Sequence, residues 1–359
     1  MPSIDAISID KPGSADRRTL ATTASGETVV LTRSDIARLM TQEDYLRAAE
    51  IAFRALASGE AIAPLPMHLH GDGGGFHVKG ASLHGDRHLA AIKLNGNFPR
   101  NGETFGLPTI QGAVFLADAT NGALLAVMDS IEITLQRTAA ASALAARHLA
   151  RPGSSRLAVC GCGEQGRAQL AAFAAMFALE DVCVWDRDPD RARILANEMG
   201  ERLAVAVHAV DQLEAATSRA DIIVTCTTAR AWFLGREHVR PGAFIAAVGA
   251  DNPEKSEIAP ELMARSRIVV DVLGQCLTMG DLHHAIDAGA VTAADVCADL
   301  GQIVSGKGQG RLSDNEIWIF DSTGTAALDV ACAARVYARA LEEDAGIRVR
   351  FGTHQRRDS

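Results

Sequence analysis

The sequence predicts an α/β protein with two domains, and three observations support this prediction. The chain has 359 residues, which is more than a single hydrophobic core usually organises. From residue 156 onward, short apolar segments alternate with helical ones, a pattern typical of a parallel sheet covered on both faces. The first 150 residues instead carry hairpin and long-helix patterns, so we expect the two parts to fold differently.

Period-two and helical patterns divide the front part into five elements. Apolar and polar residues alternate on both sides of the glycine-rich stretch 71–75, which predicts a hairpin. The expected elements are, in order, a helical segment over 34–58 with possible caps at Ser34 and Thr41, a hairpin over 66–83, a strand over 88–99, a second hairpin over 109–129 and a long helix over 130–150.

The second part is predicted to alternate buried strands with helices. Its apolar segments are short and lie between helical segments, as in βαβ units. The expected strands are 156–161, 181–186, 221–227, 243–250, 267–272 and 316–322. The clearest expected helices are 164–178, 188–200 and 325–344.

Composition and charge exclude several classes of protein. Hydrophobic residues make up 48% of the chain and charged residues 22%, as is usual for globular proteins. The 44 acidic residues outnumber the 35 lysines and arginines, and the net charge of −9 argues against nucleic-acid binding. We expect neither a membrane span nor secretion, because the sequence contains neither an apolar run of about 18 residues nor an apolar signal segment.

The seven cysteines are expected to be free thiols of a cytoplasmic protein. Their number is odd, and no C-x-x-C pair occurs. Several lie in apolar segments, as is typical of small buried side chains in a reducing compartment. Cys160 and Cys162 flank a glycine in a turn, so a redox or metal role for this pair stays an alternative.

A dinucleotide-binding motif follows the first strand of the second part. Gly161, Gly163 and Gly166 form G-x-G-x-x-G between this strand and a helix. The first glycine permits a tight turn, the second lets the backbone approach a pyrophosphate, and the third lets the helix pack closely. Glu164 and Gln165, at the start of the helix, are assigned to the same site.

Asp186 favours NAD as the cofactor. It ends the next strand, 20 residues beyond Gly166, where a carboxylate can bind the ribose hydroxyls and repel a 2′-phosphate. Arg187 is adjacent and could bind that phosphate, so NADP stays an alternative. Thr138 and Thr227 are also assigned to the cofactor site.

Lys93 and Arg137 lie among apolar or small residues, where an unpaired cation would cost several kcal/mol. A substrate carboxylate could be their partner, and a structural Asp or Glu is an equally good alternative. Asp251 follows a strand that should end at the carboxyl edge of the sheet, where it could exchange protons beside a nicotinamide. A turn or helix-capping aspartate is the alternative for this residue.

With these motifs in place, the chain closely resembles the ornithine cyclodeaminase/mu-crystallin family, which includes archaeal-type alanine dehydrogenases and ketimine reductases. The resemblance extends over about residues 30–345 and is specific because several motifs occur together. The matching segments are the Lys-x-x-x-x-x-Pro strand at 93–99, Gly-Leu-Pro-Thr at 106–109, Arg-Thr-Ala-Ala at 137–140, G-x-G-x-Q at 161–165, Gly249-Ala250-Asp251 with Lys255 and Glu257, and FDSTGTAALD at 320–329.

The resemblance implies a domain arrangement. Residues 1–150, completed by 320–359, would form an α+β domain that binds substrate and makes a homodimer. A Rossmann-type NAD-binding domain would be inserted over 151–319. The glycine motif would then lie in mid-chain because the substrate-binding domain is built from both ends.

The resemblance also implies roles and a reaction. Lys93 and Arg137 match cations that bind the substrate carboxylate, and Asp251 matches an acid/base that acts at the amine. We take ornithine cyclodeaminase, which forms proline and ammonia through an imine, as the best single prediction. The alternatives are an imine or ketimine reductase, or an amino-acid dehydrogenase of the alanine or iminosuccinate/aspartate type. A non-catalytic NAD(P)H-regulated binding protein of the mu-crystallin type is a further alternative, which the presence of Asp251 disfavours.

The chain departs from the family pattern near the first hairpin. Leu65 stands where many members have an arginine, and Lys79-Gly80 stands where they often have Met-Pro. Lys79 could replace the lost arginine, bind a second acidic group of a dicarboxylic substrate, or be a surface lysine. His77 shares its strand face and could line the substrate pocket.

Several other histidines crowd this region of the sequence. His68 and His70 are spaced so that they could ligate a metal. We expect no metal, because neither hydride transfer nor the family requires one.

Overall fold

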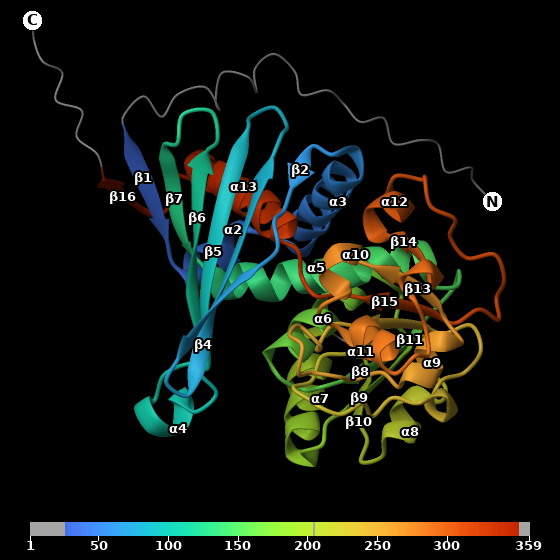
Figure 1. Ribbon diagram of the computed structural model, residues 1–359. Coiled ribbons are helices and arrows are strands. Elements are labelled where there is room, and N and C mark those ends of the chain that lie inside the picture. Colours follow the sequence, from blue (N-terminus) through green and yellow to red (C-terminus); the bar gives the residue numbers. More distant parts are fainter. Residues whose placement is uncertain (1–25, 204, 352–359) are drawn as a thin grey trace, which may run out of the picture.

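The computed structural model describes residues 26–203 and 205–351, which form two eight-stranded sheets with helices around them (Figure 1). One sheet is largely antiparallel and the other is entirely parallel. The long helix α5 (Ser130–Leu149) lies between the two parts (Figure 1) and contacts elements of both. The predicted α/β fold class is confirmed. Within the described residues, every helix is too short or too polar to cross a membrane.

The first sheet is built mainly from the front of the chain. Its strands, in spatial order, are β16 (Ile347–Arg350), β1 (Glu27–Leu31), β7 (Leu124–Asp129), β6 (Ile110–Asp118), β5 (Leu89–Asn97), β4 (Gly74–Leu83) and β2 (Ala61–Ile62), with β3 (Met67–Gly71) paired to β4. Only β1 and β7 pair in parallel. The predicted hairpins are present as β3–β4 and β6–β7.

Helices cover one face of this sheet. Helix α13 (Ala326–Glu342) packs on β4 and β5, and α3 (Gln42–Ser58) packs on α13 and α5. Their contact faces are rich in alanine and close-packed, with Phe53 fully buried among them. The short helix α4 (Asn101–Phe105) follows β5.

The helical segment predicted over 34–58 consists of two helices. The possible cap at Thr41 is confirmed, whereas the N-cap of the first helix is Thr32 and not Ser34. Helix α2 (Arg33–Leu39) ends before Thr41, and the side chain of Thr41 accepts a hydrogen bond from the backbone N–H of Asp44 at the start of α3. The carboxylate of Asp44 accepts in return from the Thr41 N–H, which completes a capping box. The local cap therefore overrides the continuous apolar periodicity.

The second sheet contains only parallel pairs. Its strands, in spatial order, are β10 (Val207–Ala209), β9 (Asp181–Trp185), β8 (Arg156–Cys160), β11 (Ile222–Thr225), β12 (Phe244–Ala247), β15 (Trp318–Asp321), β13 (Arg267–Val270) and β14 (Val296–Asp299). The surrounding helices are α6 (Glu164–Met176), α7 (Pro189–Leu203), α8 (Leu213–Thr217), α9 (Pro260–Ala264), α10 (Leu273–Cys276), α11 (Asp281–Asp287) and α12 (Leu300–Val304), with 3-10 turns η1 (Arg236–His238) and η2 (Ala293–Asp295).

Strand β15 joins the two parts of the molecule. It lies inside the parallel sheet between β12 and β13, and the chain then leaves that sheet to enter α13. The boundary predicted between residues 319 and 320 therefore falls within a strand, and the end of β15 at Asp321 is where the chain changes sheet.

Asp44 ties the N-terminal helices to the C-terminal helix. Its Oδ1 accepts hydrogen bonds from Arg335 Nε and Nη2 of α13, at 3.0 and 2.8 Å. Burial acts to raise the pKa of Asp44, but the bonds from Thr41 and Arg335 outweigh it and lower the pKa to about 2. This pKa is below that of the unfolded chain, so the charged form stabilises the fold above pH ~4, and the effect is lost as the pH falls toward 2.

We predict that Asp44→Asn lowers the free energy of unfolding at pH 7 by ~1–2 kcal/mol. This range allows for solvent screening of the ion pair, because Arg335 is partly exposed to solvent. Urea unfolding at several pH values measures the effect, and the difference from the wild type should shrink as the pH falls toward 3. Asp72→Asn, in an exposed hairpin turn, is the control. A difference that is constant with pH would contradict this account.

Candidate active site

The glycine turn lies at the carboxyl end of β8, where the strand order reverses. Strands β9 and β11 flank β8, and open α/β sheets bind ligands at such a point. Gly161 has a φ of +111°, and a Cβ on Gly166 would lie 2.1 Å from the Gly161 oxygen, so both positions require glycine. Gly163 precedes α6, and a Cβ there would have no described atom within 4 Å. The first N–H groups of α6 are thus open to a phosphate.

Asp186 is held against this turn at the end of β9. Its Oδ2 accepts a hydrogen bond from the Cys162 N–H at 2.8 Å, and its Oδ1 accepts from the Asp188 N–H at 3.0 Å. The exposed Arg187 follows it. A fixed carboxylate beside the turn fits ribose hydroxyls and disfavours a 2′-phosphate.

Of three other residues assigned to the cofactor site, Glu164 and Gln165 join the two parts of the molecule, and Thr138 bonds within its own helix. Glu164 Oε2 accepts a hydrogen bond from Arg33 Nη2 at 3.0 Å. Gln165 Nε2 donates to a backbone carbonyl of α5 at 3.3 Å. Thr138 lies within α5 and donates its hydroxyl hydrogen bond to a carbonyl one turn earlier. The start of α6 is therefore anchored on α5, the helix that carries Arg137.

Lys79, Lys93 and Arg137 form a cluster of cations near one carboxylate, that of Asp329; Lys93 and Arg137 are buried and Lys79 is half-buried. Lys79 and Lys93 are direct cross-strand neighbours on β4 and β5. Lys93 Nζ lies 2.8 Å from both carboxylate oxygens of Asp329, and Arg137 Nε lies 3.2 Å from its Oδ1. Lys93 and Arg137 are 3% and 5% exposed. The alternative of a structural acid is thus correct in part, because Asp329 pairs with both.

The cluster carries more positive charge than its carboxylate balances. Burial, together with Arg137 and Lys79, lowers the pKa of Lys93 to about 7, although Asp329 opposes the shift. Burial acts to raise the pKa of Asp329, but Lys93 and Arg137 outweigh it and lower that pKa. Three basic groups against one acid leave room for an anionic ligand, and Arg137 suits a carboxylate.

Lys79 points into the cluster and is not a surface lysine. Its Nζ donates hydrogen bonds to the carbonyl oxygens of Thr323 and Gly324, at 3.0 and 2.8 Å, in the turn before α13. Burial and the nearby Arg137 lower the pKa of Lys79. Leu65, at the place of the missing arginine, is 68% exposed.

Asp251 approaches this cluster from the second sheet. It follows β12, its side chain is 56% exposed, and Lys255 Nζ lies 2.7 Å from its Oδ1. Burial of the surrounding site acts to raise the pKa of Asp251, but Lys255, Lys79 and His77 outweigh it and lower that pKa. The carboxylate is therefore charged, and it lies near enough to Lys79 and His77 for their charges to act on it.

His77 is placed on the site face of β4. Burial and the neighbouring His68 lower its pKa, while Asp251 opposes the shift. The rings of His68 and His77 are perpendicular, with centroids 4.6 Å apart. Across residues 26–203 and 205–351, no three His, Cys, Asp or Glu side chains are arranged to hold a metal ion.

Glu257 is a site residue to which the sequence motifs assigned no role. It is fully buried, its Oε1 accepts hydrogen bonds from both N–H and Oγ1 of Thr227 at 2.6 Å, and its Oε2 accepts from the Gly249 N–H at 2.9 Å. One side chain therefore fixes the loops that follow β11 and β12. Asp329 was missed in the same way, and both residues lie in segments that carry the family resemblance.

Comparison with known proteins places the chain in a family. A sequence profile named ornithine cyclodeaminase/mu-crystallin family matches residues 26–344. The chain belongs to this family. The predicted resemblance is thereby confirmed over most of the chain.

Three solved relatives share the fold. An archaeal alanine dehydrogenase dimer with bound NAD has a TM-score of 0.87 and 35% identity, covering 91% of this chain and all of that one. The Delta(1)-pyrroline-2-carboxylate reductase of Thermococcus litoralis, with NADH and L-proline, has a TM-score of 0.86 and 31% identity, over 90% and 100% of the chains. The iminosuccinate reductase of Paracoccus denitrificans, with NAD⁺, has a TM-score of 0.82 and 31% identity, over 90% and 99%. All three hold NAD or NADH, in agreement with the predicted cofactor.

We predict that Glu257→Gln perturbs either the loop that follows β11 or the loop that follows β12. A glutamine accepts through one oxygen only, so either the Thr227 or the Gly249 N–H faces an amide donor, at a cost of ~1–3 kcal/mol. If the hydrogen bond from the Thr227 N–H is lost, NADH binding should weaken by roughly 5- to 100-fold. If the hydrogen bond from the Gly249 N–H is lost, kcat should fall by a similar factor, because the loop that carries Asp251 shifts. NADH titration and steady-state kinetics separate the two outcomes. Glu261→Gln, exposed on α9, is the control, and unchanged values of both quantities would refute the role.

Proposed function

We propose that the protein is an NAD-dependent oxidoreductase that interconverts a small α-amino acid and its imine. The observation that carries this proposal is the excess of positive charge at Lys79, Lys93 and Arg137, near Asp251 beside the glycine turn. Such a cluster fits a substrate carboxylate. Arg137 and Lys79 would orient the substrate, and the glycine turn and the start of α6 would hold the pyrophosphate of the cofactor.

The residues divide the work of the reaction. The glycine turn and Asp186 would hold NAD, which would supply the hydride acceptor or donor of the reaction. Arg137 and Lys79 hold the carboxylate and orient Cα. Lys93, with a pKa near 7, is able to exchange a proton with the substrate nitrogen at neutral pH. Asp251 is charged and positioned to take a proton from the amine or from an attacking water.

Within this reaction class, an imine reductase or amino-acid dehydrogenase suits the site better than ornithine cyclodeaminase. Ornithine carries a second cationic amine, which the uncompensated charge of Lys79 and Arg137 would repel. A neutral side chain avoids this repulsion, and a second carboxylate would be attracted. Activities on imines of monocarboxylic and dicarboxylic acids are also those named for the three solved relatives.

A substrate panel tests this proposal. We expect NADH oxidation with pyrroline-2-carboxylate, with pyruvate plus ammonia, or with oxaloacetate plus ammonia, followed by absorbance at the nicotinamide band. Ornithine with catalytic NAD⁺ should release little proline. Proline formation from ornithine without net NADH would instead establish a cyclodeaminase, and failure of every amine and imine while NADH still binds would favour a binding protein.

We predict that Lys79→Met raises the KM for the preferred carboxylate substrate by roughly 10- to 100-fold, because one cation of the carboxylate site is lost. Lys79→Arg should recover part of the loss. Lys307→Met, exposed beside α12, is the matched control. An unchanged KM with a normal cofactor affinity would show that Lys79 has only a structural role.

We also propose that the protein is a homodimer, formed through the uncovered face of the first sheet. Ile92, Leu94, Phe115 and Phe76 are 53%, 36%, 37% and 37% exposed on neighbouring strands of that face. A contiguous apolar face of this kind marks an interface. The solved archaeal relative is described as a dimer.

Ile92→Glu is expected to convert the dimer into a monomer in light scattering after size exclusion, because it places a charge in the apolar contact. Ile194→Glu is the control, since Ile194 has a similar exposure of 57% but lies on α7. A wild-type protein that is already monomeric at micromolar concentration would refute the dimer.

A further inference from the structure

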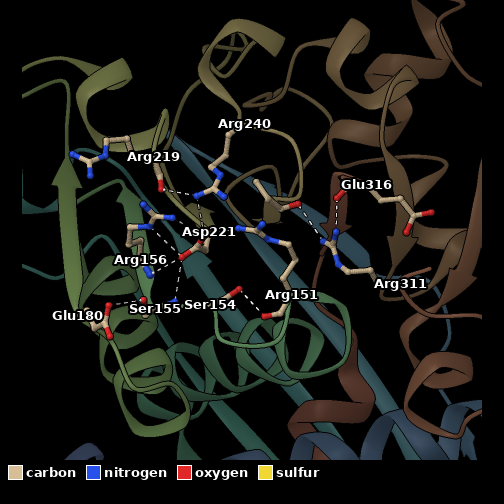
Figure 2. A network of polar contacts seen from close by, with 11 residues as sticks. Arg151, Ser154, Ser155, Arg156, Glu180, Arg219, Asp221, Arg240, Arg311 and Glu316 are labelled. Carbon is tan, nitrogen blue, oxygen red and sulfur yellow. Dashed lines mark hydrogen bonds and ion pairs between the residues drawn. The ribbon is translucent and has the colours of Figure 1, made fainter. Parts of the chain in front are cut away.

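Arginines gather around Asp221 at the amino edge of the parallel sheet, opposite the glycine turn (Figure 2). Asp221 Oδ1 lies 2.8 Å from Arg151 Nη2 and 3.1 Å from Arg240 Nη1, and its Oδ2 lies 3.3 Å from Arg156 Nε. The three arginines come from the segment after α5, from β8 and from the segment before β12. Their side chains are 23–33% exposed, and that of Asp221 is 5% exposed.

The arginines of this cluster carry more positive charge than Asp221 balances. Three guanidinium groups share one carboxylate, which also accepts hydrogen bonds from the Ser155 and Arg156 N–H groups. Burial and the nearby Arg151 lower the pKa of Arg240, and Asp221 offsets this only in part. Arg151 Nε is buried and has no acceptor among the described residues. This buried donor does not face the hollow, and it is the excess of guanidinium charge around Asp221 that favours an anion.

The cluster lines a hollow of about 690 Å³. Its acids other than Asp221 are Glu180, Asp181 and Asp314, and Glu180 accepts a hydrogen bond from Ser155 Oγ at 3.1 Å. Glu180 and Asp314 are exposed, so they form a rim around the more buried floor. The rim disfavours an extended polyanion and leaves the floor accessible to a compact anion.

We propose that this arginine hollow binds a single phosphate group, free or as a small monoester. Guanidinium forks match phosphate oxygens in pairs, and a dianion offsets the two charges that Asp221 leaves unbalanced. The hollow lies at Arg156, at the start of β8, whereas the glycine turn follows Cys160 at its end. One strand length, roughly 13 Å, therefore separates it from the cofactor phosphates. The bound phosphate would fix the segment that links α5 to β8.

Thermal unfolding of the enzyme saturated with NAD⁺ tests the proposal, because the cofactor then blocks the glycine turn. At constant ionic strength, inorganic phosphate should raise Tm by about 2 °C relative to chloride once its concentration reaches roughly ten times Kd. Glycerol 3-phosphate in a parallel arm distinguishes a monoester from the free ion. Isothermal titration of the NAD-loaded enzyme with phosphate gives the affinity directly.

Substitutions of the arginines around Asp221 test whether the phosphate-dependent Tm shift arises in this hollow. Arg240→Gln and Arg151→Gln should lose the phosphate-dependent shift, Arg240→Lys should retain part of it, and Arg47→Gln, at an exposed position on α3, should retain all of it. Each shift is measured within one variant, so a lower starting Tm does not affect the comparison. Equal shifts with chloride and phosphate, or a full shift in Arg240→Gln, would overturn the site. Neither result depends on which substrate the enzyme uses.

Discussion

The ion pairs between the carboxylate of Asp329 and two buried cations are the interaction on which the rest of the structure depends. Lys93 and Arg137 would each be strongly destabilising in the interior without a partner. Asp329 lies on α13, near the end of the chain, 236 residues from Lys93. The C-terminal helix must therefore return to β4 and β5, and the parallel sheet becomes an insertion between the two halves of one domain.

The same constraint orients the first sheet. Because Lys93 must face α13, strand alternation turns Ile92 and Leu94 outward. An antiparallel sheet usually exposes its polar face, but here the polar side chains of β5 are inside with the site. The apolar exposure of the outer face is thus a consequence of placing cations at the substrate site, and it creates a need for a covering surface.

Local sequence predicts this molecule well where the chemistry is local. The glycine turn follows from residues within one strand–turn–helix unit, and the shared strand face of His77 and Lys79 follows from hairpin alternation. Asp329 and Glu257 could not be identified by such reasoning, because a buried carboxylate is recognised by its partners and these lie far away in sequence. Thr41 is recognisable as a possible cap from its local sequence, but continuous helical periodicity hides the break between α2 and α3. The predicted border at 319 falls within β15, because this strand stays in the parallel sheet while the following helix α13 packs on the first sheet.

Three buried acids, Glu257, Asp281 and Asp321, hold loops that follow strands of the second sheet by accepting hydrogen bonds from their backbone N–H groups. Beyond Glu257, Asp281 accepts hydrogen bonds from the Glu257 and Ile258 N–H groups, and Asp321 accepts from the Asp281 N–H. Loops at strand ends leave backbone donors without acceptors, and carboxylates supply two oxygens each. Close packing of like charges has a cost: burial and Glu257 raise the pKa of Asp281 to about 7, and burial and Asp281 raise that of Asp321. The loop that leads to Asp251 is thus held at Gly249 by Glu257, and Glu257 is in turn held through Asp281 and Asp321.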